Sequence, residues 1–272
     1  PLLDYYEKHF DFISPVSRKN EVISFVKSGL KDLSISRKTF SWGIKVPNNN
    51  DHVIYVWLDA LTNYLSALNY PDINNELYKK FWPASIHLIG KDILRFHAIY
   101  WPAFLLAAKI DLPKKIYGHG WILSGDEKMS KSKGNILDPI KVISEYGLDP
   151  LRYYLIKEVS FGNDGNISQE RLEDCNNSDL ANNYGNLCQR VTAFAIKNCE
   201  GKIPSKINFQ KEDLLILNKY KNNLENIRKN IDSQNLNYYI DYIVNSLFEA
   251  NKYFNDQEPW KKKNDQERLN TI

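Results

Sequence analysis

The amino-acid sequence predicts an α/β fold followed by an α-helical bundle, and two observations support this. Short stretches rich in β-branched and aromatic residues are separated by segments with helical spacing, which is typical of βαβ units in a parallel sheet. These stretches are residues 52–58, 85–90 and 114–123. From about residue 175 few strand signals remain, and apolar residues recur three and four positions apart, which predicts a helix. They are Leu236, Tyr239, Ile240, Ile243, Leu247, Ala250 and Phe254.

Three further segments have predictable structure. Residues 91–110 carry aromatic side chains at helical spacing, so one face of a helix is expected to be aromatic. Residues 136–159 contain two Asp-Pro pairs, at 138–139 and 149–150. Asp is a favoured helix cap and Pro suits the first helical position, so each pair is expected to open a short helix. Residues 201–212 are expected to form a loop between two helices of the bundle.

The composition excludes several classes of protein. The 272 residues, 43% of them apolar, are enough for roughly two globular domains. No apolar run approaches a membrane span and no signal peptide is recognisable, so a cytoplasmic location is expected. Cys175, Cys188 and Cys199 have neither disulfide-framework nor zinc-ligand spacing. The net charge of +3 is too small to indicate nucleic-acid binding by itself, although Lys261–Lys263 could meet phosphates.

A basic loop, KMSKSKGN at residues 128–135, is the most distinctive local pattern. Lysine is almost never buried unpaired, and Ser, Gly and Asn favour turns, so these residues are expected to face solvent. The simplest interpretation is a solvated basic surface. The alternative is a phosphate-binding loop, because lysine ammonium and backbone N–H groups both stabilise phosphate oxygens, although the spacing is not that of a P-loop.

The chain resembles the bacterial methionyl-tRNA synthetases, which are class I aminoacyl-tRNA synthetases, in this loop and in five other passages. These are SISRKTFSWGIKVP (34–47), YVWLDALTNYLSALNY (55–70), HLIGKDILRFHAIYWPAFL (87–105), NLCQR (186–190) and PW (259–260). The loop alone indicates only class I, whereas the aromatic passages indicate the methionine type. The resemblance implies the second half of a Rossmann-like nucleotide-binding fold followed by an anticodon-binding bundle.

The resemblance also implies a reaction, in which methionine attacks the α-phosphate of ATP and is then transferred to tRNA(Met), with Mg²⁺ assisting the phosphates. Charge develops on the leaving pyrophosphate, so cations that close over it stabilise the transition state. Lys128 and Lys131 are the expected catalytic residues, and Lys131 is the lysine expected to contact ATP. Lys133 is either a third contact or a solvated bystander.

Gly90, Lys91 and Asp92 are the other positions at which the resemblance implies ATP binding. Asp92 follows a predicted strand end, where ligands bind in open α/β sheets and where a carboxylate can accept hydrogen bonds from both ribose hydroxyls. The alternative role for Asp92 is a helix cap. The two roles are compatible.

Six positions match the methionine-binding residues of the family. They are Trp57, Ala60, Leu61, Tyr64, His97 and Trp101. His97 and Trp101 are four residues apart and share a helix face. Aromatic rings suit a polarisable thioether, and a hydrogen from histidine or tyrosine that reaches sulfur would reject a plain hydrocarbon. Without the resemblance, an aromatic stripe is more often ordinary core.

Asn186, Arg190 and Trp260 match the family's anticodon-binding positions. Asn186 and Arg190 are four residues apart, so they share a helix face and could bond to base edges, and Trp260 could stack on an unpaired base. The alternatives are an exposed polar helix face for Asn186 and Arg190, and a packing anchor for Trp260.

The His-x-Gly-His signature of class I synthetases does not occur in this sequence. The chain begins at Pro1 without methionine and ends in polar residues without a stop signal. We therefore expect a fragment that is inactive alone, and it carries no indication of a zinc site. The predicted segments are the tail of an inserted domain (1–52), the second half of the catalytic domain (53–125), the lysine loop with stem-contact helices (126–174) and a truncated anticodon-binding domain (175–272).

Two rival functions remain. A class I synthetase for another aliphatic amino acid would lack the set Trp57, Tyr64, His97 and Trp101. A tRNA-binding module without catalysis would need neither the lysine loop nor Asp92.

Overall fold

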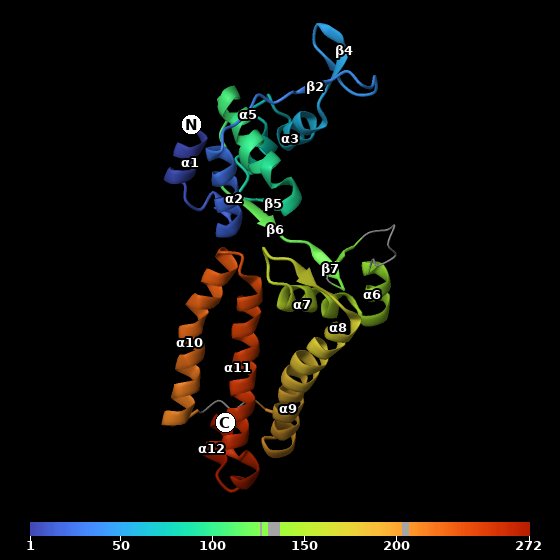
Figure 1. Cartoon of the computed structure of the whole chain (residues 1–272). Helices are drawn as coiled ribbons and strands as arrows, with labels where there is room; N and C mark the ends of the chain where they lie inside the picture. The colour runs from blue at the N-terminus through green and yellow to red at the C-terminus, as the bar shows by residue number, and fades with distance from the viewer. Residues whose placement is uncertain (126, 130–136, 203–206) are drawn as a thin grey trace. The chain divides into compact units, whose positions relative to one another are not determined.

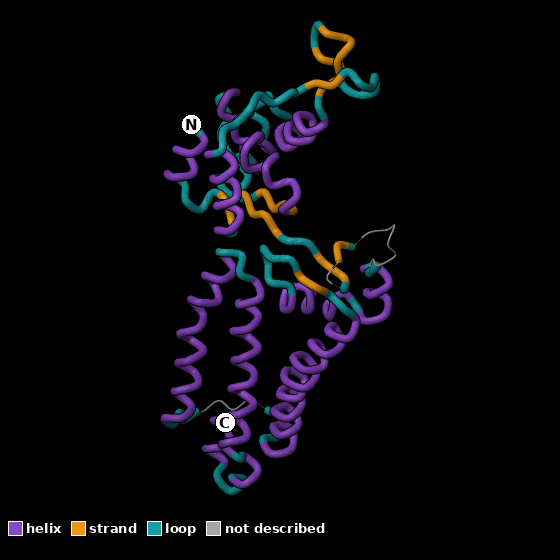
Figure 2. Tube along the Cα trace, in the orientation of Figure 1, coloured by secondary structure: helices purple, strands orange, loops and turns teal. Residues whose placement is uncertain are grey.

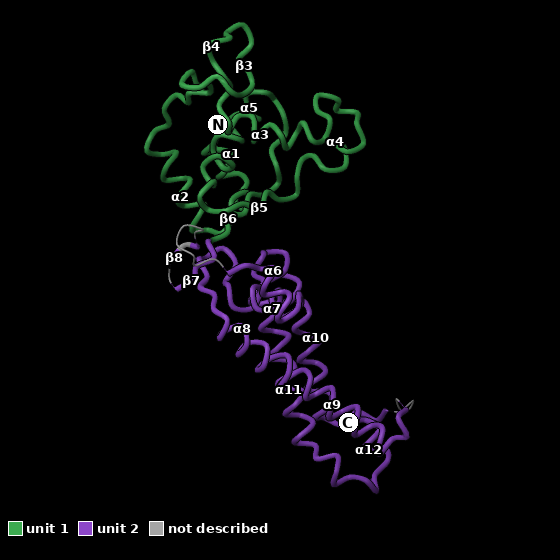
Figure 3. Tube along the Cα trace, turned by 90° about the vertical axis from the view of Figure 1, so that its right-hand side faces the viewer, with its two compact units in different colours: residues 1–120 green, residues 121–272 purple. Residues whose placement is uncertain are grey.

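The computed structural model describes residues 1–125, 127–129, 137–202 and 207–272. It divides into two compact units, residues 1–120 (unit 1) and 121–272 (unit 2), which are coloured separately in Figure 3. Figure 1 labels most of the helices and several strands of both units.

Unit 1 is built on a parallel sheet with strand order β1-β6-β5. The strands are β1 (Ile13–Ser14), β5 (His87–Gly90) and β6 (Ile116–His119). The helices of this unit are α1 (Leu2–Lys8), α2 (Val16–Lys27), α3 (Val56–Ser66), α4 (Glu76–Phe81), η1 (Lys91–Ile93), η2 (Phe96–Tyr100) and α5 (Trp101–Ala108).

The core of unit 1 joins this sheet to α1, α2 and the helical segment that follows β5. Tyr6, Val22, Ile89 and Ile116 are buried there. Gly118 on β6 lets the helical segment come close, because a Cβ at that position would lie 3.3 Å from Leu94 Cδ1. Burial of these apolar side chains is the main force that holds the sheet and its helices together.

A second, antiparallel sheet corrects one expectation. Its order is β2-β4-β3, formed by β2 (Ser36–Arg37), β3 (Lys45–Val46) and β4 (Asn49–Ile54). The prediction that residues 52–58 add a strand to the parallel sheet is therefore wrong. Strand β4 ends at Ile54 and helix α3 begins at Val56, because Leu61 and Leu65 bury one face of that helix. The third parallel strand is β1, whose two residues are too few to show a periodicity.

The predicted helix at 91–110 is helical but not uniform, since a 3₁₀ turn (η1) and a π-helical turn (η2) precede α5. The predicted strand at 114–123 splits between β6 in unit 1 and β7 in unit 2.

Unit 2 consists mainly of helices, as the purple tube of Figure 2 shows, with one small sheet of order β8-β7-β9. Its strands are β7 (Ile122–Ser124), β8 (Glu127–Lys128) and β9 (Gly165–Asn166). Its helices are α6 (Pro139–Tyr146), α7 (Leu148–Glu158), α8 (Gln169–Cys175), η4 (Asn176–Gly185), α9 (Asn186–Asn198), α10 (Lys211–Asp232), α11 (Leu236–Gln257), η5 (Pro259–Lys261) and α12 (Gln266–Thr271).

The starts of these helices agree in part with the predictions made from the sequence. Asp138 caps α6 as predicted, since its side chain accepts a hydrogen bond from the backbone N–H of Ile140. The predicted second helix is also present, as α7, but it begins at Leu148, so the second Asp-Pro pair lies in its first turn and not at the cap and first positions. The predicted loop at 201–212 ends when α10 begins at Lys211.

The helical bundle is confirmed, with α10 and α11 as its longest helices. Phe254 of the predicted stripe is buried on α11, together with Val244, which the predicted stripe did not include. The predicted fold class, an α/β part followed by a helical bundle, is thereby confirmed. Within the described ranges, no helix combines the length and apolar character that a membrane span requires.

Candidate functional site

The predicted methionine-binding residues come from two helical segments of unit 1. Helix α3 carries Trp57, Leu61 and Tyr64, which lie on one face because they are three and four residues apart. Segment η2–α5 carries His97 and Trp101, also four apart. All five lie in one aromatic cluster, in which Leu61, His97 and Trp101 are buried. Ala60 is exposed and lies outside this cluster.

A hydrogen bond joins the two segments. The hydroxyl of Tyr64 lies 2.9 Å from His97 Nε2, and His97 Nδ1 lies 3.0 Å from the carbonyl oxygen of Ile93. A carbonyl oxygen can only accept, so the imidazole hydrogen belongs on Nδ1. Nε2 is then an acceptor for the Tyr64 hydroxyl, provided that the ring is neutral.

Burial keeps the His97 ring neutral. Loss of solvation lowers the pKa of His97, and the bond to the Ile93 carbonyl opposes this only in part. The same loss of solvation raises the pKa of Tyr64, which therefore keeps its hydroxyl hydrogen. The pair is a neutral, fixed hydrogen-bonding group at the wall of an apolar site.

Two residues of this cluster were missed by the sequence analysis, His87 and Trp82. The ring centroid of His87 lies 4.3 Å from that of Tyr64, and Trp82 meets Trp101 edge-on at 6.1 Å. Burial, and secondarily the neighbouring His97, lowers the pKa of His87 to about 4. The passage HLIGKD held a signal for His87, because residues 87 and 89 both point to the same face of β5.

The cluster contains polar atoms that a ligand or water could satisfy. Among the described residues, Nε1 of Trp82, Nε1 of Trp101 and Nε2 of His87 are buried without a hydrogen-bond partner. Tyr64, Trp82 and His87 also line a cavity of about 660 Å³. Buried polar atoms in native proteins are nearly always hydrogen-bonded, so unpaired ones beside a cavity indicate a place for another molecule.

Trp57 extends the aromatic wall. Its ring stacks on Phe96 with centroids 3.9 Å apart and planes 9° from parallel, and it meets His97 edge-on at 6.2 Å. Phe96 is a third residue of this cluster that the sequence analysis did not assign to the site. Stacked and edge-to-face rings of this kind form a rigid apolar surface.

Gly90, Lys91 and Asp92 lie where β5 ends and η1 begins. The carboxylate of Asp92 folds back over Gly90, since a Cβ on Gly90 would be 2.6 Å from Asp92 Oδ1. A side chain at position 90 would therefore require the Asp92 carboxylate to move. The exposed Asp92 carboxylate stands at the carboxyl edge of the parallel sheet, as the sequence predicted.

The predicted catalytic lysines belong to unit 2. Lys128 is the last residue of β8 and pairs with Leu123 of β7. Lys131 and Lys133 lie outside the described residues.

The predicted RNA-binding residues lie on α9 and η5 of unit 2. Phe254 of α11 connects two of them, because the Arg190 guanidinium lies 5.2 Å from its ring centroid and Trp260 meets the same ring edge-on at 6.4 Å. Arg190 Nη2 also donates to Asn255 Oδ1 at 2.5 Å. Asn186 is exposed one turn before Arg190 on α9.

Trp260 is partly exposed to solvent and lies next to buried residues. Its side chain is 42% exposed, whereas Pro259 and Phe254 beside it are buried. An exposed aromatic face held by a buried edge suits a stacking platform. Phe254 was expected only as a core residue of the helical stripe, and Asn255 was not predicted at all.

No metal centre is evident in the part of the chain that the structure describes, where no group of three or more His, Cys, Asp or Glu side chains could hold an ion. Cys175, Cys188 and Cys199 are free thiols.

Comparison with known proteins shows what this chain is similar to. Residues 2–192 match the model of the family described as tRNA synthetases class I (M). The methionine–tRNA ligase of Brucella suis biovar 1 is 52% identical over 272 residues, which are 100% of this chain and 53% of that protein. That of Rickettsia bellii is 53% identical over 272 residues, with 98% and 53% covered. The chain thus spans about half the length of the curated relatives it matches.

Solved structures give the same result for the fold. A structure titled Mycobacterium tuberculosis methionyl-tRNA synthetase in complex with methionyl-adenylate superposes with a TM-score of 0.93 at 48% identity, covering 99% of this chain and 54% of that chain. The apo form of the M. tuberculosis enzyme superposes with a TM-score of 0.90 at 45% identity, with the same coverage.

Proposed function

This chain belongs to the class I (M) family of tRNA synthetases, and from that premise we propose that the protein carrying it joins methionine to AMP and then to its tRNA. The observation that carries the proposal is the Tyr64–His97 hydrogen bond inside an aromatic cluster. The relatives named methionine–tRNA ligase, and the neighbour solved with methionyl-adenylate, support the same activity.

The aromatic cluster suits the methionine side chain. Trp57, Leu61 and Trp101 offer apolar walls for a flexible thioether, and sulfur interacts favourably with ring edges. Tyr64 contributes a hydroxyl to this cluster, and neutral His97 fixes its position. A site with a placed polar group discriminates against a ligand that leaves that group unpaired.

ATP is proposed to bind through Gly90, Lys91 and Asp92, with Lys128 and Lys131 acting on the phosphates. The carboxylate of Asp92 would accept hydrogen bonds from the ribose hydroxyls, because Asp92 follows the end of β5 and nucleotides usually bind at this edge of open α/β sheets. Lys131 would stabilise the pyrophosphate as it leaves, when its charge is largest. Mg²⁺ is proposed as a partner of the ATP phosphates, since the described residues offer it no protein cluster.

Transfer to tRNA is proposed to use unit 2. Asn186 and Arg190 would bond to base edges of the CAU anticodon, and Trp260 would stack on an unpaired base. The proximity of Arg190 and Trp260 around Phe254 supports a common RNA-binding surface. The four domain assignments made from the sequence are kept as part of this proposal, for segments 1–52, 53–125, 126–174 and 175–272. The cytoplasm is proposed as the compartment in which the protein works.

The experiment that tests this function is amino-acid-dependent ATP–pyrophosphate exchange by the protein that carries this chain. We expect exchange with methionine and not with leucine, isoleucine or valine. Exchange with one of these aliphatic amino acids instead of methionine would favour the first rival function. No exchange with any amino acid, together with tRNA binding, would favour a non-catalytic module.

A further inference from the structure

Trp260 is displayed on a short segment between two helices of unit 2. Helix α11 ends at Gln257 and α12 begins at Gln266, and η5 between them holds Trp260. Glu258 turns the chain with a φ of 44°, in the left-handed region. The Phe254 ring meets the indole edge-on at 6.4 Å. A half-exposed ring on such a turn needs other contacts to fix its direction.

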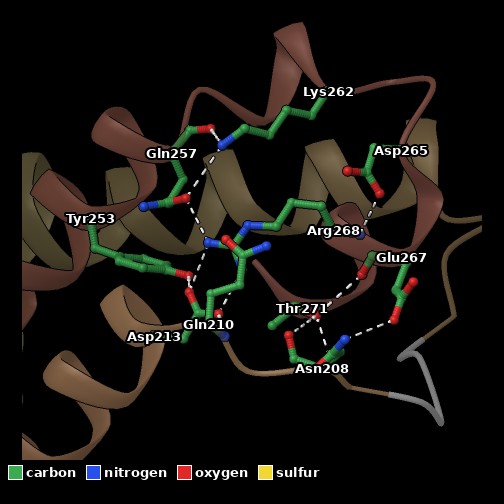
Figure 4. Close-up of polar contacts among 10 residues, drawn as sticks. All are labelled: Asn208, Gln210, Asp213, Tyr253, Gln257, Lys262, Asp265, Glu267, Arg268 and Thr271. Atoms are coloured by element: carbon green, nitrogen blue, oxygen red, sulfur yellow. Dashed lines mark hydrogen bonds and ion pairs between the residues drawn. The ribbon is translucent and has the colours of Figure 1, made fainter.

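Gln257 precedes Trp260 in the sequence and Lys262 follows it. Figure 4 shows that the Gln257 side chain connects Lys262 with Arg268. The Gln257 Oε1 atom accepts hydrogen bonds from Lys262 Nζ at 3.3 Å and from Arg268 Nη2 at 2.6 Å. Lys262 Nζ also donates to the backbone carbonyl of Gln257 at 2.5 Å. These hydrogen bonds join the two ends of segment 257–262, so that the segment forms a closed loop that includes Trp260.

Arg268 connects the closed loop 257–262 to the start of α10. Its Nη1 and Nη2 donate to the two carboxylate oxygens of Asp213 at 2.5 and 2.8 Å. Both side chains are almost fully buried, at 5% and 3% exposure. Asp213 also accepts from the backbone N–H of Gln210 at 2.7 Å and from the Tyr253 hydroxyl.

The Asp213 carboxylate stays ionised in this network. Burial alone would raise the pKa of Asp213, but the bonds from Arg268, Tyr253 and Gln210 lower it to about 2. A buried ion pair of this kind adds little net stability over an apolar replacement, and its best-attested role is to select one arrangement. Here the arrangement that it selects includes the Trp260 turn.

We propose that Asp213, Arg268, Gln257 and Lys262 form a clamp that holds Trp260 in the orientation in which it stacks on an unpaired RNA base. Arg268 and Gln257 are positioning residues, since Arg268 is buried and both act through hydrogen bonds of the segment that carries Trp260. The inference rests on the proposed function. Fixing the ring before RNA binds removes an entropy cost that binding would otherwise carry.

The test compares two clamp variants with a matched control in the protein that carries this chain. Gln257→Leu removes the acceptor and leaves the Arg268–Asp213 pair intact, and Arg268→Lys keeps the charge but loses the two-pronged geometry. Lys219→Met is the control, because it breaks the 3.0 Å ion pair between Lys219 of α10 and Glu249 of α11 without touching the clamp. Each variant is assayed for aminoacylation, for ATP–pyrophosphate exchange and for thermal midpoint.

We expect both clamp variants to raise the KM for tRNA about 3- to 10-fold, a part of the loss expected for a whole base stack. The turnover number, exchange and the Lys219→Met control should stay at the parental level. In protein labelled with fluorotryptophan, the ¹⁹F resonance of Trp260, assigned with Trp260→Phe, should shift or broaden in the clamp variants while the other resonances stay. Added to Trp260→Ala, Gln257→Leu should have no further effect, because it acts through that ring.

The outcomes distinguish a failure of the clamp proposal from a failure of the proposed RNA-binding function. If Trp260→Ala raises the KM for tRNA and Gln257→Leu does not, the clamp is overturned and the proposed function stands. If Trp260→Ala has no effect on tRNA, the RNA-binding role and the clamp fall together. An equal rise in KM for Lys219→Met would show a general effect of helix packing and would also overturn the clamp.

Discussion

In unit 1 the candidate substrate-binding side chains His97 and Trp101 are themselves core residues, each 2% exposed, whereas in unit 2 the candidate RNA-binding Trp260 is 42% exposed. Asp213 and Arg268, two of the buried polar residues of unit 2, pair with each other and are not candidate ligand contacts.

This difference determines how stability and function are connected. A small ligand must be surrounded, so the residues that contact it in unit 1 also hold that unit together. An RNA base needs only one face, so the contact residue in unit 2 can be changed without emptying a core. Mutations should therefore affect stability and binding together in unit 1 and separately in unit 2.

The largest expected effect is that of Trp101→Ala. Removal of this buried ring should destabilise unit 1 by about 3–5 kcal/mol, since it leaves a cavity beside Trp82 and Tyr64. The KM for methionine should rise as well, measured in exchange below the thermal midpoint. Leu105→Ala is the control, because Leu105 is buried in the same cluster and should lose stability alone. A folded Trp101→Ala protein with the parental KM would separate the two properties and break the comparison.

Lys131→Ala should slow adenylate formation by about 10²- to 10³-fold, or about 2–4 kcal/mol, because the lost charge acts mainly in the transition state. Methionine binding and the thermal midpoint should hardly change. Lys133→Ala, at the proposed bystander, serves as the comparison. Parental exchange rates for Lys131→Ala would remove this lysine from the mechanism.

The two units should respond to acid in different pH ranges. His87 has a folded pKa of about 4 against 6.5 when unperturbed, so the unfolded chain binds a proton that the folded one does not between these values. Stability of unit 1 should therefore fall as the pH drops from 6.5 to 4, by up to about 3 kcal/mol. Asp213, with a pKa lowered from 3.8 to about 2, stabilises unit 2 above 3.8, and this contribution is lost only as the pH falls towards 2.

Urea unfolding at pH 7 and pH 4.5, monitored in each unit, measures this difference. The variant His87→Phe should remove most of the loss between these two pH values. A loss of the same size in parent and variant would mean that other groups are responsible.

Trp260→Ala should lower the kcat/KM for tRNA by a factor that corresponds to about 1–3 kcal/mol of transition-state stabilisation, the value of one base–aromatic stack. ATP–pyrophosphate exchange without tRNA should stay intact. Phe248→Ala, at a half-exposed ring on the preceding helix α11, is the control. Equal charging by Trp260→Ala and parent, where both are folded, would mean that the indole is only a packing anchor.

Local features of this structure were predictable from the sequence because they depend on residues close in the chain. The stripe from Leu236 to Phe254 predicted α11, Asp138 predicted a cap, and the four-residue spacing of His97 and Trp101 predicted a shared face. The same spacing brought Trp57, Leu61 and Tyr64 together on α3.

Features that depend on pairing between distant segments were not predictable in this way. Strand β1 has two residues and exists only because β6 pairs with it, and β4 joins an antiparallel sheet through partners that its own sequence does not specify. Arg268 and Asp213 are 55 residues apart, and Phe254 is 64 residues from Arg190. Periodicity describes which face of a helix is buried, but it does not identify what that face meets.

The most direct test of the account is the selectivity of ATP–pyrophosphate exchange for methionine over norleucine, its hydrocarbon analogue, in Tyr64→Phe. This variant keeps the ring beside His87 and Trp101 and removes only the hydroxyl that bonds to His97. If the Tyr64 hydroxyl turns its hydrogen from His97 Nε2 to the sulfur of bound methionine, the ratio of kcat/KM for methionine to that for norleucine should fall about 3- to 10-fold in this variant, with norleucine exchange near the parental level. An unchanged ratio in the folded variant would contradict the claim that the Tyr64–His97 pair selects methionine.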